Sequence, residues 1–422
     1  MEQKIYNEYV EILKEELLPA MGCTEPIAVA YAAAVAVQAL GEKPESVEVN
    51  VSANIIKNVK SVVVPCTGGL RGIGAAVCAG IVAGCPEKEL EILEEITGEQ
   101  KVEMKKMLDT MPMTIRESDK EYIFDIQIKA CAGGHSGYVE IAGFHTNVIC
   151  VKKDDEIIRE KAYEEQGSSC ATDRSLLTVE QIIEFADCVD VADVEEVLQR
   201  QIDYNWAIAE EGMTGNWGAA IGKTLMEAYG NSVHNRAKAM AAAGSDARMN
   251  GCELPVVINS GSGNQGMTTS LPVIVYAKEL NVSKEMMLRA LVVSNLITIH
   301  MKTGIGRLSA YCGAISAGCG AGAGICYLYG GRAYEISHVI VNAVAINSGV
   351  VCDGAKASCA AKIASAVEAG LLGLQMQKNG KQFYGGDGLV EKGVENTIRN
   401  IGELAKKGMR ETDKTIIQIM TR

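Results

Sequence analysis

The sequence predicts an α+β fold, in which an N-terminal helix pair and a mixed α/β domain precede a larger all-α domain. Three observations support this prediction. The chain has 422 residues, and at roughly 100–200 residues per domain it is long enough for two or three domains. Alternating apolar residues, typical of strands, are confined to residues 45–165. Helical periodicity dominates from Thr178 onward.

Residues 1–44 are expected to form two helices that contribute to the active site. The first 20 residues are acidic and amphipathic, which favours a surface helix. After the turn at Gly22, an alanine-rich helix is expected from about Thr24 to Leu40, with Thr24 near its N-cap and Pro26 in its first turn.

Residues 45–165 are expected to form the α/β domain. Strands are predicted in the alternating segment SVEVNV and in the β-branched run SVVV, both within residues 45–65. Helices are predicted over residues 68–84 and 86–107. Strands return over residues 121–152, where the turn CAGGHSG separates two of them.

Residues 170–422 are expected to form the all-α domain. Long segments of helical periodicity, such as KEMMLRALVVSNLITIHMK, alternate here with glycine turns. The polar residues 153–175 are the expected boundary between the two domains, as a linker or a crossing segment.

Composition limits the partners and the location of the protein. The formal net charge of −13 makes nucleic acid and anionic membranes unsuitable partners. The longest apolar stretches are dominated by Ala and Gly, so no membrane span is expected. The acidic start does not resemble a secretory signal, which favours a cytoplasmic, reducing location. There, 14 cysteines point to metal or catalytic use or to burial in the core, rather than to disulfides.

Three cysteines of the helical region lie in turns marked by Gly or Asp: Cys312, Cys352 and Cys359. Three thiolates suit an iron–sulfur cluster in which one iron keeps no protein ligand and acts as a Lewis acid. The alternative is that these are small core residues beside tight helix contacts, since no CxxC run is present. Cys319 and Cys326 follow Cys312 at intervals of seven and are rival ligands.

Cys23 lies directly before the helix that begins at Thr24. Free N–H groups and the helix dipole attract a carboxylate there and lower the pKa of a thiol. Cys23 is therefore a candidate thiolate base, and the N–H groups near Thr24 are a candidate clamp for a substrate carboxylate. The alternative is an ordinary capped helix.

Several polar segments are candidates for binding an anionic substrate. Glycines and small polar residues between a β-branched run and a helix predict an anion-binding nest, which lacks the Gly-Lys-Ser/Thr of a nucleotide phosphate loop. Lys302 and Arg307 place two cations ahead of Cys312. The candidate substrate-binding residues are Thr24, Ser52, Asn54, Thr67, Ser260, Gly261, Ser262, Asn264 and Lys302.

Five motifs together resemble the L-cysteine desulfidase family, which is related to the iron–sulfur L-serine dehydratases. The motifs are MGCTEP, PCTGG, SGSGNQG, KTGIGRLSAYCG and VCDGAKASC, in this order from residue 21 to about 360. The resemblance implies an enzyme with an oxygen-sensitive [4Fe–4S] cluster and no pyridoxal phosphate. The implied reaction converts the small-molecule substrate L-cysteine, with water, to hydrogen sulfide, pyruvate and ammonia, and the relatives imply a homodimer.

The resemblance assigns cluster binding to Cys312, Cys352 and Cys359 in the helical domain. The dehydratases have Cys-Asp-Pro where this chain has Cys-Asp-Gly, and a longer step to the last cysteine, so Cys359 is the least secure ligand. They also have a Ser-His-Thr-Gly-Pro-like turn where this chain has Gly-Cys-Thr-Glu-Pro. Cys23 is then the base or, as a rival assignment, a ligand.

Three alternatives stay open. The substrate is L-serine, converted at the same site; or the SGSGNQG loop is the phosphate cup of a pyridoxal phosphate lyase; or the chain binds a cluster without catalysis. Assays of sulfide and pyruvate, borohydride trapping of a cofactor and turnover of amino acids distinguish them.

Overall fold

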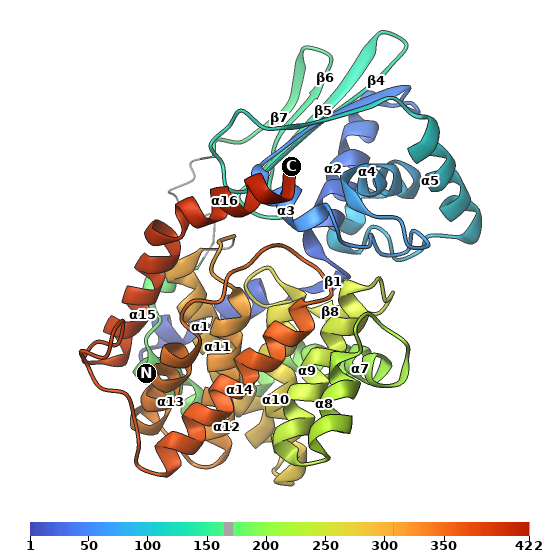
Figure 1. The fold of residues 1–422 in the computed structure, drawn as a ribbon. Coiled ribbons are helices and arrows are strands. Elements are labelled where there is room, and N and C mark those ends of the chain that lie inside the picture. Colours follow the sequence, from blue (N-terminus) through green and yellow to red (C-terminus); the bar gives the residue numbers. More distant parts are fainter. Residues whose placement is uncertain (164–171, 307, 422) are drawn as a thin grey trace.

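The computed structural model describes residues 1–163, 172–306 and 308–421 (Figure 1). It confirms the predicted fold class, because a mixed α+β region with a six-stranded sheet precedes a largely helical region. No helix in these ranges is long and apolar enough to cross a bilayer.

The N-terminal region is built around one sheet with the strand order β3-β2-β4-β5-β6-β7. β2 and β3 run parallel, and each of the other neighbouring pairs is antiparallel. The elements of this region are α1 (Gln3–Glu16), β1 (Pro19–Met21), α2 (Thr24–Leu40), β2 (Ser46–Val51), α3 (Ala53–Val59), α4 (Gly72–Ala83), the 3-10 helix η1 (Pro86–Glu91), α5 (Gly98–Thr110), β3 (Met113–Glu117), β4 (Asp125–Ala132), β5 (His135–Ala142), β6 (Val148–Lys153) and β7 (Glu156–Glu160).

The C-terminal region is a packed assembly of helices with one short strand. Its centre is α12, which packs between α10, α11, α13 and α14. Its elements are η2 (Arg174–Leu176), α6 (Val179–Cys188), η3 (Val191–Asp193), α7 (Glu195–Thr214), α8 (Ile221–Tyr229), α9 (Val233–Met249), β8 (Pro255–Val257), α10 (Gly263–Glu279), α11 (Lys284–Ile305), α12 (Gly313–Leu328), α13 (Ala333–Asn347), α14 (Cys359–Lys378), α15 (Val394–Glu403), the π-helix η4 (Leu404–Gly408) and α16 (Arg410–Thr421).

The two N-terminal helices belong to different regions. α1 packs on the helical region, where the rings of Tyr6 and Tyr9 contact Phe185 of α6. α2 covers one face of the sheet and packs against α4 (Figure 1). Between them, β1 pairs with β8 of the helical region. The chain therefore crosses from one region to the other directly before α2.

The predicted element boundaries are partly wrong. The helix Thr24–Leu40 is confirmed, but residues 53–59 form a helix, and the run SVVV forms only an isolated bridge from Val63 to Arg71. The edges of β2 are already paired with β3 and β4, so this run finds no place in the sheet. The boundary segment contains β7, and its residues 164–171 lie outside the described part of the chain.

The contact between α2 and α4 depends on a residue without a side chain. A Cβ atom added to Gly80 of α4 would lie 1.9 Å from the carbonyl oxygen of Ala30 in α2. The position of a Cβ atom is fixed by its own helix backbone, and the carbonyl oxygen belongs to the backbone of α2. The clash therefore cannot be relieved by rotating a side chain. Overpacking of this kind typically costs about 1–3 kcal/mol.

We expect Gly80→Ala to lower the free energy of unfolding by at least about 1 kcal/mol, because α2 and α4 must move apart. Chemical denaturation followed by circular dichroism measures this. The matched control is Gly98→Ala, because a Cβ at Gly98 meets no atom within 4 Å; stability should be unchanged or slightly raised there. Equal stability of the Gly80→Ala variant and the unchanged protein would contradict the packing argument.

Candidate active site

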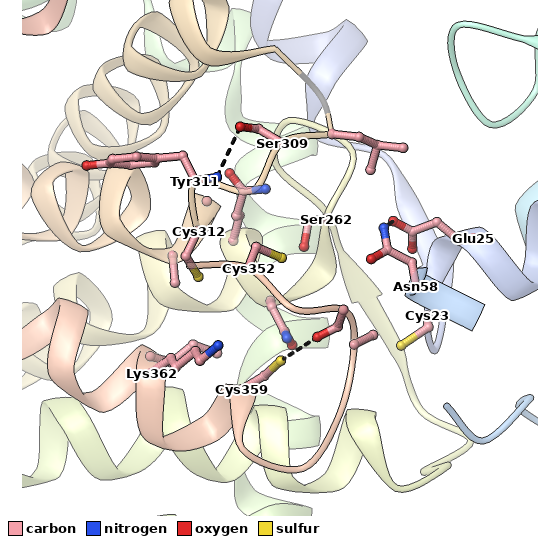
Figure 2. A pocket seen from close by; sticks show the side chains of 18 of the residues that line it. Cys23, Glu25, Asn58, Ser262, Ser309, Tyr311, Cys312, Cys352, Cys359 and Lys362 are labelled. Atoms are coloured by element: carbon pink, nitrogen blue, oxygen red, sulfur yellow. Dashed lines mark hydrogen bonds between the residues drawn. The ribbon is translucent and has the colours of Figure 1, made fainter. Parts of the chain in front are cut away.

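A cavity of about 110 Å³ lies between the N-terminal region and the helical region (Figure 2). One wall comes from the start of α2 and from α3, and the other from the start of α10, the segment before α12 and the turn before α14. Cys23, Cys312, Cys352 and Cys359 all line it. The cysteines that the sequence singled out therefore meet at one place.

Backbone pairing brings Cys312 and Cys352 together across forty residues of sequence. Tyr311 and Val351 form an antiparallel bridge. On either side of it, the N–H of Cys312 donates to the carbonyl of Val350 at 3.1 Å, and the N–H of Cys352 donates to that of Ala310 at 2.6 Å. These main-chain hydrogen bonds therefore hold Cys312 and Cys352 next to each other without a bound ligand.

Cys359 reaches the same cavity through a turn that begins at Cys352. Asp353 stabilises this turn by ion pairs with Lys356 and, at 2.5 Å, with Lys362. Both lysines lower the pKa of Asp353 to about 2, which keeps its carboxylate charged. Cys359 is the first residue of α14, and its thiol lies 3.6 Å from the carbonyl oxygen of Gly354.

Gly354 explains why this chain has Cys-Asp-Gly at the turn. Its φ of +91° lies in the left-handed region, and a Cβ there would be 2.4 Å from the carbonyl oxygen of Lys57. Proline has its φ fixed near −65° and cannot adopt this conformation. The glycine lets the cysteine turn lie directly against α3.

The rival cysteines Cys319 and Cys326 are buried within α12 and do not line the cavity. Burial raises the pKa of each to about 12, as expected for core thiols. In the ranges 1–163, 172–306 and 308–421, no group of three His, Cys, Asp or Glu side chains is arranged to hold a single metal ion.

Burial favours the neutral thiol at Cys312 and Cys359. Burial, with a further contribution from Cys352, raises the pKa of Cys312 to about 12. Burial also raises the pKa of Cys359, against the opposing charges of Lys356 and Lys362. A bound metal centre would supply the positive charge that ionises such thiols.

The expected low pKa of Cys23 is wrong for this structure. Cys23 directly precedes α2, as predicted, but it takes the N-cap position that was expected for Thr24, and its side chain is only 1% exposed. Burial raises the pKa of its thiol to about 12, although Arg248 acts in the opposite direction. Desolvation of the thiolate therefore outweighs the helix N-terminus.

The predicted anion-binding nest lies at the start of α10. Ser262 is the N-cap residue of α10, and Ser262 and Asn264 line the cavity. The carbonyl of Gly261 accepts a hydrogen bond of 3.1 Å from the hydroxyl of Thr24, which joins the starts of α2 and α10. The amide oxygens of Asn264 and Gln265 are buried and find no hydrogen-bond partner among the described residues. These oxygens are available to a ligand.

Two other predicted residues lie at the edge of this arrangement. Ser260 lines a second cavity of about 340 Å³, and the buried Lys302 lines both cavities. Arg307, the second predicted cation of that segment, lies outside the described residues.

Six of the nine predicted substrate-binding residues do not line the first cavity: Thr24, Ser260 and Gly261, which lie next to lining residues in the sequence, and Ser52, Asn54 and Thr67. The hydroxyl of Ser52 donates to the carbonyl of Ile123, and that of Thr67 donates to the carbonyl of Val64 within its own turn. Asn54 is the second residue of α3. Ser52 and Thr67 therefore stabilise local backbone, which small polar residues commonly do in turns and caps.

A buried cation that was not predicted from the sequence, Arg248, also lines the cavity and is 3% exposed. Its Nε donates to the carbonyl of Gly22 at 2.9 Å, beside Cys23. A signal was present, because Arg248 follows the alanine-rich stretch AMAAAGSDA, where a long charged side chain is unusual.

Lys57, Asn58, Gln265 and Lys362 also line the cavity but were not among the candidate site residues. Lys57 is 2% exposed and pairs at 2.5 Å with Asp413 of α16, the helix that returns to α3 in Figure 1. Gln265 belongs to the SGSGNQG motif, and Lys57 and Asn58 follow Asn54 in a polar cluster, so a signal was present for these three residues.

Known proteins resemble this chain over most of its length. A model of the family described as serine dehydratase alpha chain matches residues 87–418. The UPF0597 protein DSY1109 of Desulfitobacterium hafniense (strain Y51) is 59% identical over 419 residues, covering 99% of this chain and 97% of that protein. A UPF0597 protein of Lachnoclostridium phytofermentans is 50% identical over 99% of this chain and 100% of its own length. The UPF0597 protein BF3772 of Bacteroides fragilis (strain YCH46) is 36% identical over 98% of both chains. The chain belongs to the UPF0597 family and carries a serine dehydratase alpha chain domain.

Proposed function

We propose that the protein is a carbon–sulfur lyase that converts L-cysteine to hydrogen sulfide, pyruvate and ammonia. The observation that carries the proposal is the meeting of Cys312, Cys352 and Cys359 at one cavity, on the wall that also contains the start of α10 (Figure 2). The domain match supports a dehydratase-like or lyase-like enzyme. The choice of L-cysteine follows from the motif resemblance and from Cys23 in the MGCTEP turn.

The residues present fit a [4Fe–4S] cluster. Thiolates are its usual ligands, and three of them leave one iron without a protein ligand. The three thiols line one cavity, so each can supply a thiolate to a separate iron of one cluster. When bound, the cluster would supply a Lewis acid for the sulfur of the substrate.

The start of α10 is suited to bind the substrate carboxylate. The helix dipole and the free N–H groups of a first turn attract an anion. Ser262 and the buried cation Arg248 line the same cavity and add a hydroxyl and a positive charge. The substrate is thereby oriented with its Cα–Cβ bond between the two walls.

Cys23 is our candidate for the base that removes the Cα proton. It lines the cavity from the wall opposite the cluster cysteines. Burial raises the pKa of its thiol to about 12 against the opposing charge of Arg248, so the proposal requires the positive charge of a bound metal centre to ionise this thiol. Transfer of the Cα proton to the Cys23 sulfur leaves an electron pair that forms the Cα–Cβ double bond as the Cβ–S bond breaks. Sulfide leaves, and the resulting aminoacrylate tautomerises and reacts with water to give pyruvate and ammonia.

L-serine is a second candidate substrate, favoured by the serine dehydratase alpha chain match. Anaerobically purified protein should be assayed with L-cysteine and L-serine in parallel, with sulfide and pyruvate measured. Faster release of pyruvate from L-serine would replace the proposed substrate. No iron after anaerobic reconstitution, together with a cofactor trapped by borohydride, would replace the cluster by pyridoxal phosphate.

Replacing any one of the three cavity cysteines by serine should remove the cluster. We expect about four iron and four acid-labile sulfide per chain in the unchanged protein, and a loss of most of both in Cys312→Ser, Cys352→Ser and Cys359→Ser. Metal and sulfide analysis after anaerobic purification measures this. Cys319→Ala is the control and should keep the cluster, because Cys319 lies outside the cavity. A full cluster in any of the three serine variants would remove that cysteine from the ligand set.

Replacing Cys23 by alanine should abolish turnover and leave the iron content unchanged. Loss of a general base typically lowers the rate by about 10²–10⁴-fold. Steady-state assays and iron analysis on the same preparation separate the two effects. Cys78→Ala is the control, because Cys78 is fully buried in α4 away from the cavity. Loss of iron from the Cys23→Ala variant would instead make Cys23 a ligand.

A further inference from the structure

Glu25 is the one carboxylate among the described residues that line the cavity. It lies in the first turn of α2, two residues after Cys23, and its side chain is half-buried. The positive end of the helix dipole favours a negative charge at this position. Figure 2 shows Glu25 on the side of the cavity away from Cys312 and Lys362.

Neutral groups contact both oxygens of the Glu25 carboxylate. The side-chain amide of Asn58 donates to Oε1 at 3.1 Å. The hydroxyl of Thr24 lies 3.1 Å from Oε2 and 3.1 Å from the carbonyl oxygen of Gly261, and its single proton is donated to one of the two. Glu25 forms no ion pair with a cation of the described residues, so its hydrogen bonds leave its charge in place. A carboxylate has about four lone-pair sites, so even two donors leave room for further ones.

Two of the cations that line the cavity have acidic partners other than Glu25. Lys57 is paired with Asp413, and Lys362 with Asp353. Arg248 lies at the start of α10, because a Cβ atom on Gly263 would be 2.5 Å from its Nε, and this Nε donates to the carbonyl of Gly22. The cavity therefore holds both a cation suited to a carboxylate and the carboxylate of Glu25.

We propose that Glu25 binds the α-ammonium group of the substrate and makes the site selective for zwitterionic α-amino acids. The inference rests on the proposed function in placing the substrate carboxylate at the start of α10. A primary ammonium has three N–H donors, and an oriented, charged carboxylate is a strong acceptor for them. Carboxylic acids without the ammonium group should then bind poorly.

The test compares two ligands that differ only in the ammonium group and that cannot undergo β-elimination. L-alanine and propionate are titrated by calorimetry into the anaerobically purified protein and its Glu25→Gln variant. We expect the unchanged protein to prefer L-alanine to propionate by at least about tenfold. In Glu25→Gln, L-alanine should lose at least about tenfold in affinity and propionate should lose none. Glu25→Asp, which keeps the charge, should recover part of the loss.

Glu11→Gln, on an exposed part of α1, is the matched control and should change neither affinity. Iron content and circular dichroism verify that the Glu25→Gln variant is folded. Equal losses for both ligands, an unchanged affinity for L-alanine, or no preference for L-alanine in the unchanged protein would each overturn the proposal. A Glu25→Gln variant with a lower kcat and an unchanged KM for L-cysteine would also overturn the proposal, because this result would identify Glu25 as a catalytic base instead of a binding residue.

The failure of the proposed function gives a different result. If L-cysteine and L-serine are not turned over while L-alanine still binds in a Glu25-dependent way, the ammonium site stands and the reaction is wrong. If L-cysteine is turned over and Glu25→Gln binds L-alanine normally, the reaction stands and the ammonium site is wrong.

Discussion

The pairing of β1 with β8 is the contact on which the candidate site depends. Three residues of β1 pair with three of β8, and the N–H of Ile258 donates to the carbonyl of Leu18 beside them. This pairing holds the start of α2 next to the start of α10, where Thr24 contacts Gly261. The two walls of the cavity belong to different regions of the fold, and this short ladder sets their separation.

Two of the three lysines that line the cavity form ion pairs with acids outside their own helices. Lys57 of α3 pairs with Asp413, and Lys362 of α14 pairs with Asp353. Burying a paired charge costs far less than burying an isolated one. Glu25 is contacted by neutral groups instead, so its carboxylate differs from the other acids around the cavity in having no cationic partner among the described residues.

The sequence predicted features that depend on neighbours along the chain. The helix Thr24–Leu40 and the start of α10 after Ser262 both follow from local signals. The strand predicted for the run SVVV does not form in the sheet. Its strand propensity is a local property, whereas both sides of β2 are already paired with other strands. Propensity in strands is decided by such tertiary context.

The sequence predicted the site residues that lie in recognisable motifs. It did not predict residues that only the folded chain brings to the cavity. Cys312, Cys352 and Cys359 were selected from their turns, but their meeting depends on a two-residue bridge between segments forty residues apart. Arg248 and Lys57 reach the cavity from α9 and α3 as buried side chains, which no spacing rule identifies. The pKa of Cys23 depends on burial, and burial is a property of the whole fold.

The ion pair between Lys57 and Asp413 has a consequence for the order in which the site is completed during synthesis. The two residues are 356 positions apart, so Lys57 leaves the ribosome long before its partner exists. Until α16 is made and docks on α3, Lys57 has to remain solvated or enter the interior without this counter-charge. The wall of the cavity that contains Lys57 is therefore completed only late in synthesis, after α16 has been made.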